Sequence, residues 1–315
     1  MKLKDLLVRK PLRLKQGDTV GIVAPAWSFD PSNFRKGLKV LKDFGFKVKF
    51  DSSIFDKHWS MAGHDIERAR QINRMFADKK VKAILCAKAG YGSIRTIPYL
   101  DKNIIRKNPK IFLGYSDITI LLAYLQSVAN MVVFHGPVLS GVFHKKMSRI
   151  TLEYFIRSLA EPFPLAETCF PSLKVVRKGR AEGKLVGGNM SMLLSAIGTP
   201  YDVDTDNKIL FLEEINEDME EIDNILIHLK LAGKLKKVRG IVFGRMVDCY
   251  DESGHKYRIK DIVDDNFADL DIPILYGFPS GHARGRGANV TMPLGVSVTI
   301  DTKRPALIFN EAGVK

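Results

Sequence analysis

Residues 110–122 read Lys-Ile-Phe-Leu-Gly-Tyr-Ser-Asp-Ile-Thr-Ile-Leu-Leu. The pattern predicts a short apolar strand, a sharp turn that carries Ser116, and then an apolar helix, which is the arrangement of a nucleophile elbow. In such a turn the serine hydroxyl stands above the sheet, beside the free N–H groups of the new helix. An elbow usually has glycine two residues after the serine, where this chain has Ile118. A serine here also suits a plain helix N-cap, so two interpretations of Ser116 stay open.

The first half of the chain alternates strand and helix patterns around this stretch. Apolar runs predict strands at 19–25, 46–50, 81–86 and 131–134, and helical spacing predicts helices at 31–44 and 65–76. Strands that are separated by helices usually pair in parallel. The alternation therefore predicts a parallel sheet with helices on both faces.

The pattern changes near residues 161–164, Glu-Pro-Phe-Pro, where we expect a linker between domains 1–160 and 161–315. Beyond it, strands are predicted at 175–186, 208–212, 240–244 and 273–278, helices at 190–197 and 218–231, and antiparallel β-structure at 290–309. The sequence therefore predicts an α/β protein in two domains.

The composition is typical of a globular cytoplasmic protein. Of the 315 residues 45% are hydrophobic, so a sizeable core can form, and no apolar run reaches the roughly 20 residues of a membrane span. Residues 1–15 alternate Leu with Lys or Arg and do not form a secretion signal. Cys86, Cys169 and Cys249 lie far apart, which fits a reducing compartment. We expect a cytoplasmic location and no membrane partner.

The net charge of +14 raises the question of an anionic partner. The basic residues are spread along the chain, with local groups at 145–146, 177–180 and 234–239. None of these groups is interleaved with aromatic residues in the manner of a base-stacking surface. Generic surface charge is the main interpretation and an anionic substrate the second, and no nucleic-acid partner is expected.

Two further side chains that can carry chemistry follow predicted strands. Glu213 comes directly after 208–212, and His282 lies in the loop after 273–278. Like Ser116, both stand just past a strand, where open α/β sheets hold ligands. The order serine, acid, histidine is one that serine hydrolases on α/β scaffolds use: the imidazole takes the hydroxyl proton and the carboxylate fixes the imidazole tautomer. The plain alternatives are a strand exit for Glu213 and a surface loop for His282.

Residues 89–95, Ala-Gly-Tyr-Gly-Ser-Ile-Arg, form a glycine turn after the predicted strand 81–86. A dinucleotide-binding loop would have a small residue in place of Arg95 and would normally follow the first strand of its unit. A tight turn that faces the Ser116 crevice fits better, with the backbone N–H groups of Gly90 and Asp117 as oxyanion donors. No His, Cys and Asp cluster has metal-ligand spacing, so we expect neither a metal nor another cofactor.

Short motifs run through most of the chain. They lie at 17–18, 23–25, 61–63, 86–93, 114–117, 135–137, 187–189, 197–200, 211–214, 281–282 and 292–295. In their order and spacing they resemble the LD-carboxypeptidases, serine peptidases that include muramoyl-tetrapeptide carboxypeptidase and the microcin C immunity peptidases. The resemblance implies an N-terminal parallel-sheet α/β sandwich with the serine, and a smaller β-rich α+β C-terminal domain with the glutamate and the histidine.

The resemblance also implies a Ser116–His282–Glu213 triad, oxyanion donors at Gly90 and Asp117, and a homodimer. The implied reaction removes terminal D-alanine from a murein tetrapeptide in cell-wall recycling, at the bond after the L-centre of the diamino acid. Hydrolysis of a peptidyl-nucleotide antibiotic is the alternative within the family. A non-enzymatic nucleotide-binding or nucleic-acid-binding protein is the alternative from another class.

Two departures from the family pattern bear on the site. Lys88 stands where the family commonly has Arg, and the loop at 283–289 is more basic than expected. Arg284 or Arg286 could hold a substrate carboxylate there, or the loop could simply be solvated. His135 is a rival base, although its neighbours Gly136 and Pro137 favour a supporting turn. We expect Asn189 to cap the helix that follows it.

Overall fold

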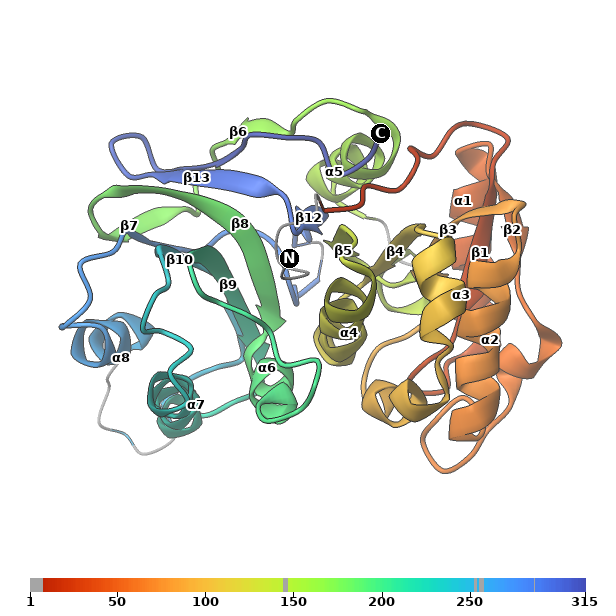
Figure 1. Cartoon of the computed structure of the whole chain (residues 1–315), viewed down its shortest axis with the longest axis horizontal. Helices are drawn as coiled ribbons and strands as arrows, with labels where there is room; N and C mark the ends of the chain where they lie inside the picture. The colour runs from red at the N-terminus through yellow and green to blue at the C-terminus, as the bar shows by residue number, and fades with distance from the viewer. Residues whose placement is uncertain (1–7, 144–146, 252–253, 255–257, 286) are drawn as a thin grey trace.

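The computed structural model describes residues 8–143, 147–251, 254, 258–285 and 287–315. It contains two sheets, one in each half of the molecule (Figure 1). The first half supplies strands β1 (Thr19–Val23), β2 (Lys47–Lys49), β3 (Val81–Cys86), β4 (Ile111–Gly114) and β5 (Val133–His135), and helices α1 (Pro31–Asp43), α2 (Asp65–Ala77), α3 (Lys102–Lys107), α4 (Thr119–Ala129) and α5 (Arg149–Ala160).

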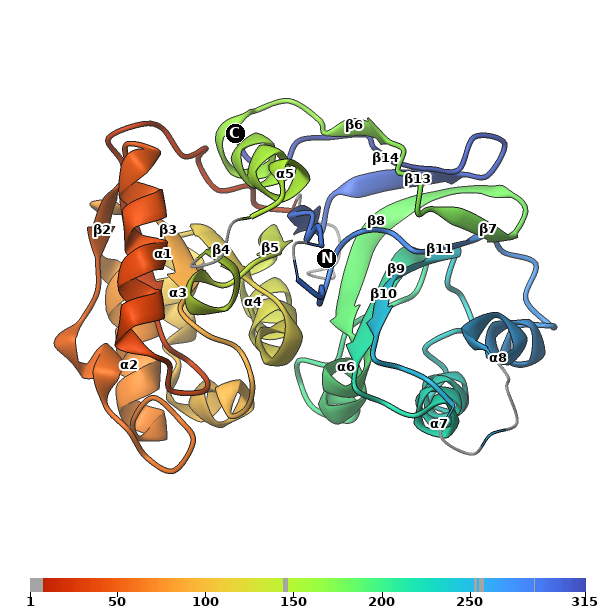
Figure 2. The same cartoon turned by 180° about the vertical axis from the view of Figure 1, so that it is seen from behind.

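Strands β1 to β5 pair in parallel in the order β5-β4-β3-β1-β2, as the alternating pattern predicts. Helices α2, α3 and α4 cover the face seen in Figure 1, and α1 covers the opposite face, seen in Figure 2. A sixth strand, β12 (Met292–Leu294), pairs antiparallel with β5 at the edge. The first sheet thus includes a segment from beyond residue 160, and the proposed domain boundary stays a prediction.

The second half supplies strands β6 (Ala166–Thr168), β7 (Lys174–Arg177), β8 (Arg180–Asn189), β9 (Lys208–Ile215), β10 (Gly240–Val247), β11 (Ile274–Tyr276), β13 (Ser297–Asp301) and β14 (Ala306–Phe309), and helices α6 (Met190–Ala196), α7 (Met219–Leu231) and α8 (Ile259–Asn266). Its sheet has a parallel core, β8-β9-β10-β11, flanked by antiparallel strands on both sides. The predicted α/β fold class is confirmed. Helices α5 and α8 are elements that the sequence pattern did not reveal.

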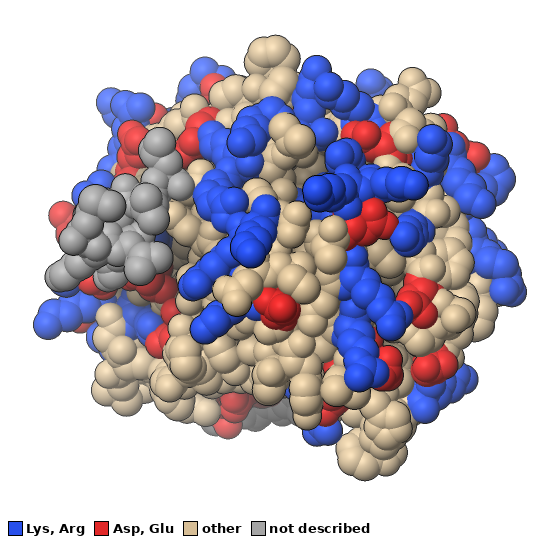
Figure 3. All heavy atoms as spheres, turned by 45° about the vertical axis from the view of Figure 1, so that its right-hand side comes forward, with Lys and Arg blue, Asp and Glu red and all other residues tan. Residues whose placement is uncertain are grey.

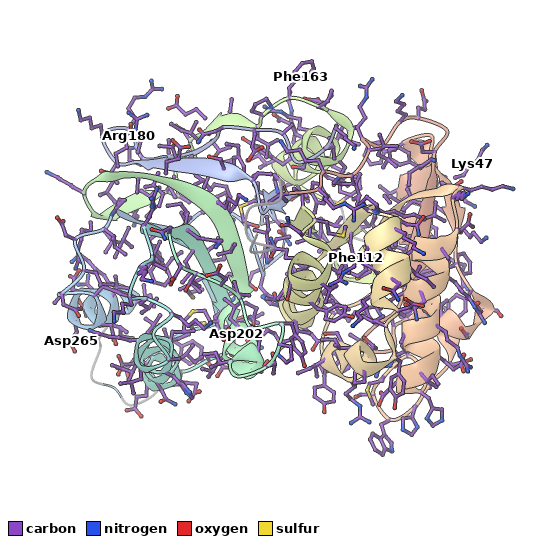
Figure 4. The ribbon with its side chains drawn as sticks, in the orientation of Figure 1. Lys47, Phe112, Phe163, Arg180, Asp202 and Asp265 are labelled. Carbon is purple, nitrogen blue, oxygen red and sulfur yellow. The ribbon has the colours of Figure 1, made fainter. Side chains whose placement is uncertain are left out.

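Strand β4 lies inside the first half. Its residues Ile111, Phe112 and Leu113 have no exposed surface, because helices cover both faces of the sheet. Figure 4 shows Phe112 among the central elements, whereas Lys47 and Arg180 project from opposite ends of the molecule. The stretch that begins the elbow is therefore anchored in the core.

Strand β9 is buried on both faces, and its side chains alternate between two cores. Leu210 and Leu212 belong to the cluster that packs α6, α7 and α8 on the second sheet. Ile209 and Phe211 belong to the larger cluster, which extends into the first half. Successive side chains of a strand point to opposite faces. Glu213 and Glu214, which follow Leu212, must therefore also point to opposite faces.

The surface carries the positive charge in a dispersed form. Figure 3 shows Lys and Arg side chains spread over the viewed face among acidic and neutral ones. Across the ranges given above, no helix combines the length and the apolar character needed to span a bilayer.

His135 is a titratable group inside the core, at the end of β5, with no exposed surface. Burial lowers the pKa of its imidazole to about 4, while the nearby Glu213 carboxylate raises this pKa and His282 lowers it further. The ring is therefore neutral in the folded protein at pH 7.

We predict that His135 makes folding stability fall on acidification. Its folded pKa, about 4, lies below the unfolded value of about 6.5, so the unfolded chain binds the proton more tightly. This contribution is complete above about pH 6.5 and is lost as the pH falls toward 4, which costs about 3 kcal/mol. Urea unfolding at pH 7 and pH 4 should show a smaller acid loss for His135→Asn than for the wild type. Equal losses in the two proteins would contradict the assignment.

Candidate active site

The turn after β4 holds Ser116 in a strained backbone conformation. Ser116 begins the 3-10 turn η4 (Ser116–Ile118), is half-buried, and has φ of 61°. Few residues other than glycine adopt this left-handed region, and a strained serine between strand and helix is the defining feature of a nucleophile elbow. The N-cap interpretation gains no support, because the N-cap positions of η4 and α4 are Tyr115 and Ile118.

Gly114 explains how Ile118 can replace the usual elbow glycine. A Cβ atom at Gly114 would come within 2.5 Å of the Ile118 side chain, so the missing side chain at 114 makes room for the larger residue at 118. An elbow needs the strand and the helix to approach closely. Here the glycine that permits this approach stands two residues before the serine, at 114, and not two residues after it.

The glycine turn packs against the elbow through Asp117. The buried Asp117 carboxylate accepts a hydrogen bond from the Ser93 N–H at 3.0 Å, and the Ser93 hydroxyl donates to the Asp117 carbonyl at 2.6 Å. Burial raises the pKa of the Asp117 carboxyl above its usual value, although hydrogen bonds from Ser93 and Gly92 oppose this rise. Gly90 has φ of 127°, and a Cβ there would lie 2.2 Å from the Trp27 ring, so only glycine fits.

Glu213 and His282 are in contact. The alternation of side chains along β9 places Glu213 on the face that carries Ile209 and Phe211, toward the first half. Glu213 is fully buried, and its Oε2 accepts hydrogen bonds from His282 Nδ1 at 2.8 Å and from the His282 backbone N–H at 3.1 Å. Burial alone raises the pKa of this carboxyl, but the charge and the hydrogen bonds of His282 outweigh it, and the net pKa is lowered. An ionised carboxylate only accepts hydrogen bonds, so Nδ1 of His282 carries the proton and Nε2 is left to face other groups.

Glu214 points to the opposite face of β9, as the alternation requires. Its carboxylate accepts hydrogen bonds from Asn189 Nδ2 at 2.6 Å and from the Ser191 N–H and hydroxyl at 2.8 and 2.7 Å. Asn189 also caps α6, since its Oδ1 accepts a hydrogen bond from the Met192 N–H at 3.2 Å. The predicted capping role of Asn189 is confirmed, and the adjacent glutamates have different surroundings.

Tyr115 brings the elbow and the histidine together, a contact that the sequence pattern did not reveal. Its ring centroid lies 4.9 Å from that of His282. Both residues line a cavity of about 130 Å³, which is also bounded by Ile215, Thr151 and Asn289. The residue that precedes Ser116 and the imidazole paired with Glu213 therefore share one small cavity. The only feature of the sequence that pointed to Tyr115 was its position next to Ser116.

The two arginines of the basic loop have different outcomes. Arg284 is exposed and forms an ion pair with Asp248, and Arg286 lies outside the described residues. Arg284 thus has a carboxylate partner within the protein, Asp248, which directly follows β10. Within the described ranges, no group of three or more His, Cys, Asp or Glu side chains could hold a metal ion.

Exposed aromatic side chains gather beside the glycine turn. Trp27 packs against Gly90, and Trp27, Trp59 and Tyr91 are 42%, 77% and 51% exposed. Arg95 lies 5.9 Å from the ring centroid of Trp59. These aromatic residues come from different parts of the chain, and no local sequence pattern indicates that they lie near the same turn.

Comparisons with known proteins cover most of the chain. The family models for the LD-carboxypeptidase N-terminal and C-terminal domains match residues 20–136 and 182–300. The "Probable murein peptide carboxypeptidase" of Bacillus subtilis is 37% identical over 308 residues, which are 97% of this chain and 95% of the relative. A crystal structure of muramoyltetrapeptide carboxypeptidase from Oxalobacter formigenes has a TM-score of 0.83 and 28% identity, and covers 93% of this chain and 99% of that one.

A further relative is MccF, the microcin C7 self-immunity protein of Escherichia coli, which is 28% identical over 94% of this chain and 93% of its own. A structure of MccF in complex with aspartyl sulfamoyl adenosine has a TM-score of 0.90 and 25% identity, and covers 98% of this chain and 100% of that one. Both domain models match in the expected order, and a relative above 30% identity spans nearly the full length. The chain therefore belongs to the LD-carboxypeptidase family.

Proposed function

We propose that the protein is a serine carboxypeptidase that releases terminal D-alanine from murein tetrapeptides. The observation that carries this proposal is the buried Glu213–His282 pair, with the ring of Tyr115 against the imidazole and the strained Ser116 next in sequence. The peptidase names of the relatives support the class of reaction, and two of those names specify a murein or muramoyl peptide. A peptide rich in carboxylates also suits a chain with a net charge of +14.

In the proposed mechanism, Ser116 Oγ attacks the carbonyl carbon of the bond to D-alanine while His282 Nε2 takes the hydroxyl proton. Glu213 holds the imidazole and stabilises the imidazolium that forms. The backbone N–H groups of Gly90 and Asp117 donate hydrogen bonds to the oxyanion that forms. The imidazolium then gives its proton to the leaving amine, so the amide bond breaks and an acyl-enzyme remains. A water molecule, deprotonated by His282, hydrolyses that ester and restores Ser116.

We also propose that the enzyme works in the cytoplasm as a homodimer, on peptides returned from the cell wall. Cys86, Cys169 and Cys249 are all free thiols, which suits a reducing compartment. The homodimer rests on the family resemblance alone.

Hydrolysis of an aminoacyl-sulfamoyl nucleoside is the second candidate. The likeness to MccF bound to aspartyl sulfamoyl adenosine favours it, as do the exposed ring of Trp27 against Gly90, the neighbouring Tyr91, and Trp59 near Arg95 of the same turn. Aromatic faces of this kind can stack on a nucleobase. A test of the activity therefore needs both substrates.

We predict that the wild type releases D-alanine from L-Ala-γ-D-Glu-meso-diaminopimelate-D-Ala and that Ser116→Ala does not. Loss of the nucleophile should lower kcat by about 10⁴-fold or more, because the acyl-enzyme cannot form. Mass spectrometry of the tetrapeptide, with aspartyl sulfamoyl adenosine in a parallel reaction, measures both activities. Turnover of the nucleoside alone would favour the second candidate. Turnover of neither substrate would contradict both.

Glu213→Gln should lower kcat by about 10²- to 10⁴-fold with little change in KM, because a neutral amide cannot stabilise the imidazolium. Glu214→Gln is the matched control, since this neighbouring buried carboxylate bonds to Ser191 and Asn189 and not to His282. It should reduce thermal stability while changing kcat by less than about fivefold. Equal losses of kcat in the two variants would remove the assigned role of Glu213.

Arg284→Ala should raise KM about fivefold at unchanged kcat if the guanidinium leaves Asp248 to hold a substrate carboxylate. Arg304→Ala is the control, because Arg304 is similarly exposed and is paired with Glu167. Steady-state kinetics at low and moderate salt compare the two variants. An unchanged KM for Arg284→Ala would mean that this arginine serves only its ion pair with Asp248.

A further inference from the structure

His135 is a buried histidine that the proposed mechanism does not use. It pairs with Gly114 in the register of β4 and β5, and the next residue, Gly136, donates its N–H to the Gly114 carbonyl at 3.0 Å. Gly114 lies two residues before Ser116. The backbone of His135 is therefore fixed beside the strand end that carries the proposed nucleophile.

The side chain of His135 reaches the loop that carries the proposed base. Its Nδ1 lies 3.2 Å from Ser280 Oγ, and the Ser280 hydroxyl donates to the Val290 carbonyl at 2.7 Å. A carbonyl only accepts, and a hydroxyl has a single proton, so Ser280 Oγ must accept from His135. Nδ1 of His135 therefore carries the proton. Ser280 lies two residues before His282, which makes this bond a link between the two catalytic segments.

The surroundings of His135 argue against a second general base. The ring has no exposed surface and is packed by Phe211 at 5.1 Å and Tyr115 at 6.2 Å between ring centroids. Its Nε2 makes no hydrogen bond with the described residues, and it is not among the residues that line the cavity at His282. A base must reach the proton that it removes, and this nitrogen is buried and does not line the cavity.

We propose that His135 is a positioning residue, whose Nδ1–H bond to Ser280 sets the spacing between the Ser116 turn and the His282 loop. This inference rests on the proposed function. The bond joins the end of β5 in the first sheet to a loop that follows β11 of the second sheet. Ser280 lies two residues before His282, and His135 is paired with Gly114, which lies two residues before Ser116. Reacting groups must lie about 3 to 3.5 Å apart, and a misplacement of about 1 Å can cost 10²-fold in rate. Loss of this bond should therefore act on kcat and leave KM unchanged.

The test compares His135→Asn with His135→Leu in the full-length enzyme. The two replacements have nearly the same shape and leave the same space, but only asparagine keeps a donor near the position of Nδ1. We expect His135→Asn to keep kcat within about threefold of the wild type and His135→Leu to lose about 10- to 100-fold, with KM unchanged in both. Thermal unfolding of both variants separates a loss of folding from a loss of positioning. Equal kcat in the two folded variants would overturn the proposal.

Ser280→Ala removes the other end of the same bond. Alone it should lower kcat about as much as His135→Leu, and the double variant should be no slower than either single variant, because one link is lost only once. Additive losses, or losses confined to KM, would overturn the proposal. Wild-type turnover of the tetrapeptide is measured alongside. An inactive wild type would refute the proposed function, whereas an active wild type with equal Asn and Leu variants would refute only the role of His135.

Discussion

A carboxylate buried at the end of β9 determines the geometry of the candidate site. Glu213 has no exposed surface, and burial of an unpaired charge costs several kcal/mol, so the charged form persists only with good partners. The partners are the Nδ1–H and the backbone N–H of His282, both on Oε2. The carboxylate therefore fixes the loop, the ring and the tautomer of His282 together. Gly281 is required there, because a Cβ would lie 2.5 Å from Glu213 Oε2.

Hydrogen bonds between the two halves fix their relative position. The Asn189 N–H donates to Thr119 Oγ1 at 3.1 Å, three residues after Ser116, and the Asn289 N–H donates to Thr151 Oγ1 at 3.0 Å. Strand β12 adds a backbone connection by pairing with β5. Each contact lies near a residue of the site, so the interface that joins the halves also sets the distances within the site.

Ser116, Glu213 and His282 were chosen from the sequence because each follows the apolar run of a predicted strand. For Glu213 that expectation was wrong, because β9 continues to Ile215 and Glu213 lies inside it. The alternation of β9 also explains, after the fact, why Glu213 and not Glu214 meets the histidine. Other features gave no local signal. The ion pair of Arg284 with Asp248 joins residues from different loops, and β12 is a three-residue edge strand that contains Pro293, where a missing N–H is tolerated. Such contacts depend on the tertiary fold and not on local pattern.

The central claim is that Ser116 is activated by the imidazole that Glu213 holds. Covalent labelling with a fluorophosphonate probe, followed by peptide mass spectrometry, tests it most directly, because the probe reacts with an activated serine and not with an ordinary hydroxyl. The account predicts one adduct per chain, located on Ser116 and strongly slowed in Glu213→Gln. An adduct on another residue, or no adduct on a protein that turns over its substrate, would contradict it.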